Sequence, residues 1–331
     1  MTGNAPGNDM RFYWERVEAS RNFANKVWNA SRFIMMNIEK APVTDVKLSD
    51  LQMADRWILS KVNTLAKDVT ENMDKYELGI ALQKVYDFIW EEFCDWYIEM
   101  VKPRLWSEED TTKAAALWTL KTVLIQSLKL LHPYMPFVTE EIYSKLVPEE
   151  ESLMMSDWPV YEEEWNFPVD ENIVDHYKEI IRGIRNVRAE MNVPNSRKAT
   201  AFVVCEDEEL GAGLALLGHA AQNMAALNEL VIQKDKSGIA DDAVSIVVPD
   251  ATVYLPLEEL IDFEQEIERL TKEEARLTKE IARSNGMLNN EKFVSKAPAA
   301  KVQEERDKLE TYQQMMAQVK ERLEGLKAKQ S

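Results

Sequence analysis

One face of a predicted helix near the N-terminus carries residue types that recognise polar ligands. Asparagine, lysine and phenylalanine recur there at i, i+3, i+4, i+7 and i+11, as Asn22, Asn25, Lys26, Asn29 and Phe33. An amide pairs with base edges or backbone groups, a lysine attracts phosphate, and an aromatic ring stacks on an unpaired base. Each asparagine lowers helix stability by about 0.5 kcal/mol relative to alanine. Three on one solvated face would therefore destabilise the helix without an evident structural benefit. Two interpretations stay open: the face reads nucleic-acid bases, or its amides tie helices together inside a bundle.

A second candidate is a row of basic residues near the C-terminus, which we call the basic rail. Its members alternate at spacings of three and four residues: Arg269, Lys272, Arg276, Lys279 and Arg283. Positions 276 to 301 hold six basic and two acidic residues, on a chain whose net charge is −18. A local positive surface on an acidic protein favours an anionic partner, whereas the alternative is an ordinary solvated helix face. The predicted contacts to the anionic partner are Arg276, Lys279, Arg283, Lys292 and Lys296.

The remaining residues give no cluster that predicts catalysis or a metal site. The histidines are far apart in the sequence and lack the spacing of ligands or of a general base: His132, His176 and His219. Two cysteines, Cys94 and Cys205, are too few for a disulfide framework or a cysteine zinc site. Both lie in apolar runs, so we expect buried thiols.

A basic series along a later helix, Lys178, Arg182, Arg185 and Arg188, has two equal interpretations. It could line nucleic acid, or it could pair with the acidic connector over residues 149–168.

These residues must be positioned by a fold that is mainly α. Amphipathic periodicity predicts a helical bundle from helices over residues 11–39, 49–75, 77–104, 111–132 and 136–146, with breaks near Pro42, Pro103 and Pro133. A small α/β domain follows, with helices over 172–191 and 208–227 and strands over 199–205, 229–233, 243–248 and 252–255. A long antiparallel coiled-coil hairpin completes the chain. The predicted divisions are a linker over 1–8, the bundle over 9–165, the α/β domain over 166–256 and the hairpin over 257–331.

The hairpin is predicted from apolar residues at heptad spacing. On the first helix they are Leu260, Phe263, Ile267, Leu270, Leu277, Ile281 and Leu288, with Glu274 and Ser284 as exceptions. On the second helix they are Val302, Leu309, Tyr312, Met316, Val319, Leu323 and Leu326. Two helices of about 30 residues would each reach about 45 Å at about 1.5 Å per residue, so we expect a projecting arm.

Composition gives the expected location. No stretch approaches the roughly 18 uninterrupted apolar residues of a membrane span. The first ten residues are polar and lack the apolar core of a signal peptide. We therefore expect a cytoplasmic protein that does not enter a membrane.

Several segments together resemble the C-terminal part of bacterial valyl-tRNA synthetases, which are class I aminoacyl-tRNA synthetases. They are R-N-F-A-N-K-V-W-N-A-S-R-F (21–33), A-D-R-W-I-L-S (54–60), Y-D-F-I-W-E-E-F-C-D-W-Y-I-E (86–99), L-H-P-Y-M-P-F-V-T-E-E (131–141), I-R-N-V-R-A-E-M-N-V-P (184–194) and F-V-S-K-A-P (293–298). The fourth segment is shared with isoleucyl and leucyl enzymes. The first and last segments are more specific to the valyl enzymes.

The resemblance implies a fragment of such an enzyme. The H-I-G-H and K-M-S-K-S signatures and the editing domain are missing, and T-G-N-A-P-G-N-D (2–9) looks like the segment that follows the catalytic fold. No catalytic residue and no cofactor are therefore expected in this part, because ATP and magnesium belong to the catalytic domain.

The resemblance also implies a monomeric protein whose partner is the valine tRNA. The bundle would bind the anticodon through Asn22, Lys26, Asn29 and Phe33, and the arm would brace the outer corner of the tRNA. Some relatives carry an arginine where this chain has Glu15, which puts a contact at that turn in doubt. The rival interpretation is a structural coiled-coil module that binds or dimerises with protein and has no nucleic-acid role.

Overall fold

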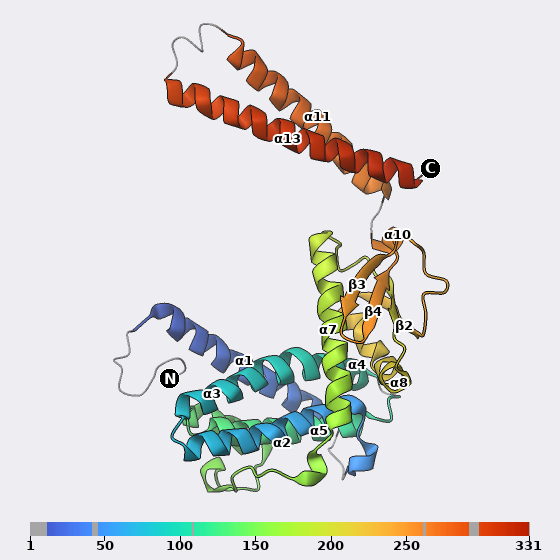
Figure 1. Ribbon diagram of the computed structural model, residues 1–331. Coiled ribbons are helices and arrows are strands. Elements are labelled where there is room, and N and C mark those ends of the chain that lie inside the picture. Colours follow the sequence, from blue (N-terminus) through green and yellow to red (C-terminus); the bar gives the residue numbers. More distant parts are fainter. Residues whose placement is uncertain (1–11, 42–45, 108, 261–262, 291–297, 331) are drawn as a thin grey trace. The chain divides into compact units, whose positions relative to one another are not determined.

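The computed structural model describes residues 12–41, 46–107, 109–260, 263–290 and 298–330. The chain forms two compact units (Figure 1), of which the first ends at Leu255 and the second begins at Pro256. The fold is mostly helical with one small mixed sheet, as the sequence predicts. Each unit is described by itself.

The first unit begins with a helical bundle. Its helices are α1 (Trp14–Ile38), α2 (Met53–Asp74), α3 (Leu78–Asp87), the π-helical η2 (Phe88–Tyr97), α4 (Ile98–Trp106), α5 (Lys113–Leu131) and α6 (Pro136–Leu146). Short 3-10 turns lie at Leu48–Asp50, Leu153–Met155 and Glu163–Trp165. Among the described residues, α5 is the one helix whose length and apolar composition would suit a membrane span. Because 61% of its most apolar stretch is buried in the protein, it serves as a core helix of the bundle.

The predicted helix over residues 77–104 is in fact three consecutive helical segments, α3, η2 and α4. The predicted break at Pro103 is wrong, because Pro103 lies inside α4, which continues to Trp106. Proline disfavours a helical turn. Here the turn is held by Arg104, whose guanidinium donates to both carboxylate oxygens of Asp55 at 2.8 and 2.9 Å.

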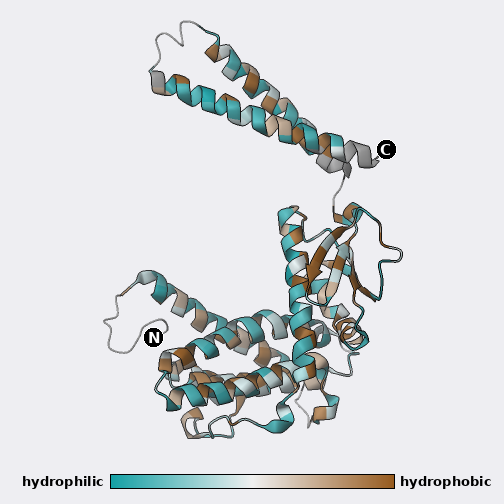
Figure 2. Cartoon of the chain, viewed as in Figure 1, coloured by the Kyte–Doolittle hydropathy of each residue, from teal (hydrophilic) through white to brown (hydrophobic). Residues whose placement is uncertain are grey.

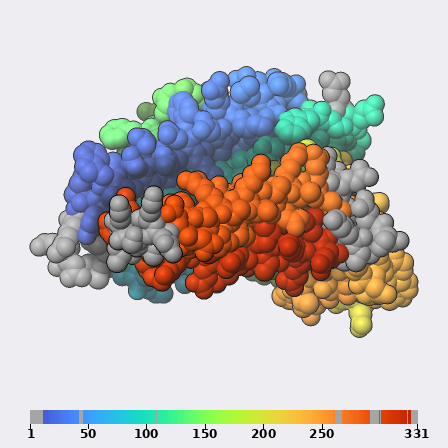
Figure 3. Space-filling model, turned by 90° about the horizontal axis from the view of Figure 1, so that it is seen from above, coloured from blue at the N-terminus to red at the C-terminus, as the bar shows by residue number. Residues whose placement is uncertain are grey.

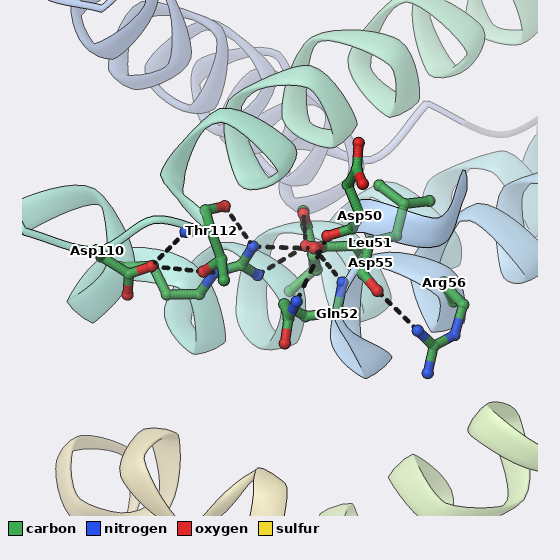
Figure 4. A network of polar contacts seen from close by, with 9 residues as sticks. Asp50, Leu51, Gln52, Asp55, Arg56, Asp110 and Thr112 are labelled. Atoms are coloured by element: carbon green, nitrogen blue, oxygen red, sulfur yellow. Dashed lines mark hydrogen bonds and ion pairs between the residues drawn. The ribbon is translucent and has the colours of Figure 1, made fainter. Parts of the chain in front are cut away.

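Asp55 is the centre of a buried polar network (Figure 4). Its side chain is fully buried and also accepts hydrogen bonds from the Tyr97 hydroxyl at 2.7 Å and from the Gln52 backbone at 2.9 Å. Arg104 extends the network to the hydroxyl and carbonyl of Thr112. The Asp55 carboxylate therefore joins α2, η2 and α4, and Arg104 links them to the residue that precedes α5.

The remainder of the first unit is the small α/β part. It consists of α7 (Pro168–Glu190), β1 (Ala199–Val204), α8 (Glu208–Leu216), α9 (Gly218–Met224), β2 (Leu227–Gln233), β3 (Val244–Val248) and β4 (Ala251–Leu255). The sheet order is β2-β1-β4-β3, with β1 and β2 parallel and the other neighbours antiparallel. All four predicted strands are confirmed.

The single helix predicted over residues 208–227 is wrong. Two helices, α8 and α9, meet at Leu217 and Gly218, and β2 begins at Leu227. Glycines make this segment a weak helix former. Gly213 has a packing reason, because a Cβ there would lie 2.6 Å from a methyl group of the Ile173 side chain on α7.

The second unit consists of α10 (Leu257–Leu260), α11 (Phe263–Leu288) and α13 (Ala299–Gln330). The helices α11 and α13 lie side by side (Figures 1 and 3), and Figure 2 shows hydrophobic residues at intervals along mostly hydrophilic helices. Leu270 packs with Leu323, and the Ser284 hydroxyl donates to Glu305 at 2.7 Å. These pairs run in opposite directions along the two helices, so the hairpin is antiparallel. Supercoiling of its helices stays a prediction.

Asp55→Asn is expected to lower the free energy of unfolding by about 3–5 kcal/mol, because the Arg104 guanidinium then stays buried without its counter-charge. Urea denaturation followed by circular dichroism measures the loss. The matched control is Asp68→Asn on the same helix, which breaks a half-exposed pair with Lys84 and should cost less than about 1 kcal/mol. Equal losses in the two variants would show that the Asp55 network does not hold the bundle together.

Candidate nucleic-acid interface

The asparagines of α1 face outward. Asn22, Asn25 and Asn29 are exposed, and their side chains make no hydrogen bond within the part of the chain that the structure describes. The buried face of α1 is formed by Phe23, Val27, Ser31 and Ile34 instead. The interpretation in which these amides tie helices together is therefore wrong. Their donors and acceptors are open to a ligand.

Lys26 lies beside the asparagines but is not isolated. Its ammonium nitrogen is 2.6 Å from a carboxylate oxygen of Asp95 and 3.8 Å from the centre of the Trp90 ring. These two residues have the i to i+5 spacing of a π-helical hydrogen bond, and η2 presents both to α1. Trp90 is held by a ring stack through Tyr86 to Phe23. A phosphate that approaches Lys26 must therefore compete with an aspartate.

Phe33 is half-buried, with the Lys102 ammonium 5.9 Å from its ring centre. Lys102 also pairs with Glu99 at 2.5 Å. The ring therefore has an exposed part on which a base could stack, and a cation lies beside it.

A second row of exposed residues on α1 was not predicted from the sequence. Trp28, Arg32 and Met36 recur every four residues and are all exposed. Arg32 and Met36 line a cavity of about 350 Å³ together with Lys121 of α5 and Lys145 of α6. The spacing of four was visible in the sequence, but the two lysines come from other helices and only the fold brings them near.

The described members of the basic rail on α11 are exposed, and most have an acidic partner on the same helix. Lys272 pairs with Glu268 at 2.5 Å, Arg276 with Glu273 at 2.5 Å and Arg283 with Glu280 at 3.8 Å. The hydrogen bond from Arg276 lowers the pKa of Glu273. Such pairs are weak because water screens them. The rail can therefore exchange these partners for another anion.

Lys279 has no acidic partner within the described residues, as its sequence neighbours predict. It is therefore the rail member that is most available to an anion. Lys292 and Lys296, the two predicted contacts at the hairpin tip, lie outside the described residues.

The basic series on α7 does not pair with the acidic connector. Lys178 is buried and pairs with Glu92 of η2 at 2.7 Å, and Arg182 pairs with Glu179 of its own helix. Arg185 donates to the carbonyl of Met224, and Arg188 donates to two backbone carbonyls that follow α7. None of these partners belongs to residues 149–168, so the pairing interpretation is wrong. Lys178 is a structural residue.

Each of the two units contains a match to a known family model. Residues 55–203 match the family model of the anticodon-binding domain of tRNA ligases. Residues 262–327 match that of the valyl-tRNA synthetase tRNA-binding arm. The first match covers α2 to most of β1 and does not include α1. The second covers the hairpin of α11 and α13.

Whole-chain relatives are valine–tRNA ligases. The chain is 49% identical over 327 residues to the enzyme of Clostridium perfringens, which covers 98% of this chain and 37% of the relative. Identity is 48% with the Clostridium acetobutylicum enzyme and 44% with that of Oceanobacillus iheyensis, each over 99% of this chain and 37% of the relative. The chain thus spans little more than a third of the length of these relatives, and its similarity to them includes α1.

Two lysines that pair with carboxylates of η2 are expected to differ in their contribution to stability. Lys178→Ala should cost about 3 kcal/mol or more, because the Lys178 side chain is only 6% exposed and Glu92 would lose its buried partner. Lys26→Ala should cost about 1 kcal/mol or less, since Asp95 is 53% exposed and stays hydrated. Urea denaturation of the two variants measures both. A Lys26 variant as unstable as the Lys178 variant would make Lys26 structural rather than available to a ligand.

Proposed function

We propose that the chain is the tRNA-binding part of a valine–tRNA ligase. The two family matches, together with relatives along nearly the whole chain, show that it belongs to the valyl-tRNA synthetase family. Its partner is then the valine tRNA, and ATP-dependent attachment of valine takes place in the rest of the ligase. The observation that carries this proposal is the pair of matches to an anticodon-binding domain and a tRNA-binding arm in one chain.

Within this proposal, α1 reads the anticodon. The exposed amides of Asn22 and Asn29 contact base edges, Phe33 stacks on an unpaired base, and Lys26 meets a phosphate. The support is the exposure of both amides and the half-exposed ring of Phe33. Lys26 is the costly contact, because its bond to Asp95 must be given up.

The arm holds the outer corner of the tRNA through phosphates and needs no base recognition. Arg276, Lys279 and Arg283 are the proposed contacts, and Lys292 and Lys296 extend the same charge toward the tip in the sequence. The exposed rail on α11 supports this assignment. A coiled-coil geometry would keep the arm straight and the rail on one side.

The proposal needs no cofactor in this part of the ligase. The sequence lacks the H-I-G-H and K-M-S-K-S signatures of the class I catalytic fold, so no catalytic step is assigned to its residues. ATP and magnesium would act in the catalytic domain. We further propose that the protein is a monomer of the cytoplasm.

The test of the whole proposal is binding of the purified chain to valine tRNA and to the same tRNA with a swapped anticodon, at low and moderate salt. Preferential binding to the valine anticodon supports α1 as the reader. Equal, salt-sensitive binding supports the arm alone. No binding at low salt, together with a doubled mass in sedimentation, would favour the rival protein-interaction module.

Variants of the α1 face are expected to change affinity in opposite directions. Phe33→Ala should weaken binding about tenfold, which corresponds to the loss of one stacked base. Lys26→Ala should also weaken it. Asp95→Asn should strengthen binding up to about fivefold, because Lys26 no longer has to leave a carboxylate of its own protein. Filter binding with valine tRNA measures all three.

The matched control for Asp95→Asn is Asp68→Asn, which removes the same charge from the bundle beside Lys84 rather than beside Lys26. It should leave affinity nearly unchanged. Equal gains in the two variants would attribute the effect to net charge and would contradict a contact at Lys26.

On the arm, Arg276→Glu combined with Lys279→Glu is expected to weaken binding to valine tRNA and to the anticodon-swapped tRNA equally. The slope of log affinity against log salt should fall by about 2, one for each lost phosphate contact. The control is Lys308→Glu with Lys320→Glu on α13, which makes the same charge change off the rail. If both pairs reduce the slope alike, the rail is not the contact surface.

A further inference from the structure

The basic series on α7 leads to a second cationic site, in the α/β part of the first unit. A cavity of about 540 Å³ lies between the C-terminal half of α7, the segment before β1, and the residues that join α9 to β2. Its polar lining consists of three cations and three amides: Arg185, Arg188, Lys198, Asn195, Gln222 and Asn223. No lining residue is acidic. None of its lining residues belongs to α1 or to the second unit.

Arg188 is the buried charge of this cavity. It is only 4% exposed, and its Nη2 donates to the carbonyls of Pro194 at 2.9 Å and Arg197 at 2.7 Å. Its Nη1 is buried without a hydrogen-bond partner in the described chain. Burial lowers the pKa of Arg188, as expected of a guanidinium that lacks a counter-charge. A buried donor that carries charge is costly unless an acceptor reaches it.

The other cations of the cavity differ in how firmly they are held. Arg185 is oriented by the bond from its Nε to the carbonyl of Met224 at 2.7 Å and by the ring of Trp96, whose centre lies 5.6 Å from its guanidinium carbon. Lys198 is exposed, and its ammonium has no partner among the described residues. The cavity is therefore lined by an oriented guanidinium, a buried guanidinium with one unpaired nitrogen, and an exposed ammonium.

We infer that this cavity binds a phosphate group. Guanidinium groups suit phosphate oxygens because they present several donors in one plane, and amides at the rim add neutral donors. The volume exceeds that of a lone phosphate, so a nucleoside or sugar that carries the phosphate fits as well. The phosphate belongs either to a small molecule or to an RNA backbone. The inference does not rest on tRNA binding, since the chemistry is the same for both sources.

The test is calorimetric titration of the whole chain with inorganic phosphate and with adenosine monophosphate at constant ionic strength, and separately with valine tRNA. The two pocket variants are Lys198→Glu and Asn223→Asp, which place a carboxylate at exposed positions of the lining. Each should reduce phosphate affinity at least tenfold. Lys236→Glu makes the same charge change as Lys198→Glu in the same small α/β part, outside the cavity, and should leave it unchanged.

The outcomes separate the two sources. Saturable binding of inorganic phosphate or adenosine monophosphate that both pocket variants lose identifies a small-molecule site. Loss of tRNA affinity in both pocket variants, with no binding of the small probes, identifies an RNA phosphate. If neither the small probes nor tRNA distinguish the pocket variants from Lys236→Glu, the inference is overturned. Because the phosphate titrations contain no RNA, their result is independent of the tRNA-binding proposal.

Discussion

The fold of the bundle depends on the charge of one buried carboxylate. Asp55 is fully enclosed, so its charge is tolerable only while Arg104, Tyr97 and the Gln52 backbone supply donors to it. Those donors come from three segments that lie up to 49 residues from Asp55 in the sequence. The carboxylate therefore fixes the position of η2 and α4 against α2 more strictly than apolar packing would. A shift of either helix along α2 would leave the buried charge of Asp55 without its hydrogen-bond donors.

The exposed chemistry of α1 follows from this constraint. The segment η2 carries Tyr97 toward the buried network, and on its outer side it carries Trp90 and Asp95 toward Lys26. The π-helical turn sets the spacing between those two partners. The position of Lys26 relative to Asn22 and Asn29 is thus maintained by a hydrogen-bond network on the other side of η2. A substitution at Asp55 would therefore make the position of Lys26 less well defined, although the two residues are not in contact.

Periodicity predicted the elements whose packing is local, and it missed features that depend on distant partners. The heptad residues Leu270, Leu277 and Leu323 are buried in the arm as expected, and the four strands lie where β-branched residues cluster. Amphipathic periodicity did not distinguish the π-helical segment from an α-helix, and it did not give the point at which α8 ends and α9 begins, although the glycines of that segment weaken a helix. The partner of Lys26 lies 69 residues away, and the cavity beside Arg188 is lined also by residues 222–226, at the end of α9 and just after it. A single sequence gives no measure of such pairings.

The acidic character of the chain explains why its cations differ so much in availability. With net charge −18, many lysines and arginines pair with a carboxylate, and at those positions a free anion gains only the difference between two ion pairs. That difference is small at Lys26 and along most of the rail. It is larger where no carboxylate competes, at Lys279 on α11 and in the cavity lined by Arg188 and Lys198. Discrimination among ligands must then come from neutral groups. The free energy of exchanging a carboxylate for a ligand anion depends little on the rest of the ligand. The exposed amides of α1 can provide this selectivity, since an amide recognises a donor and acceptor pattern rather than a charge.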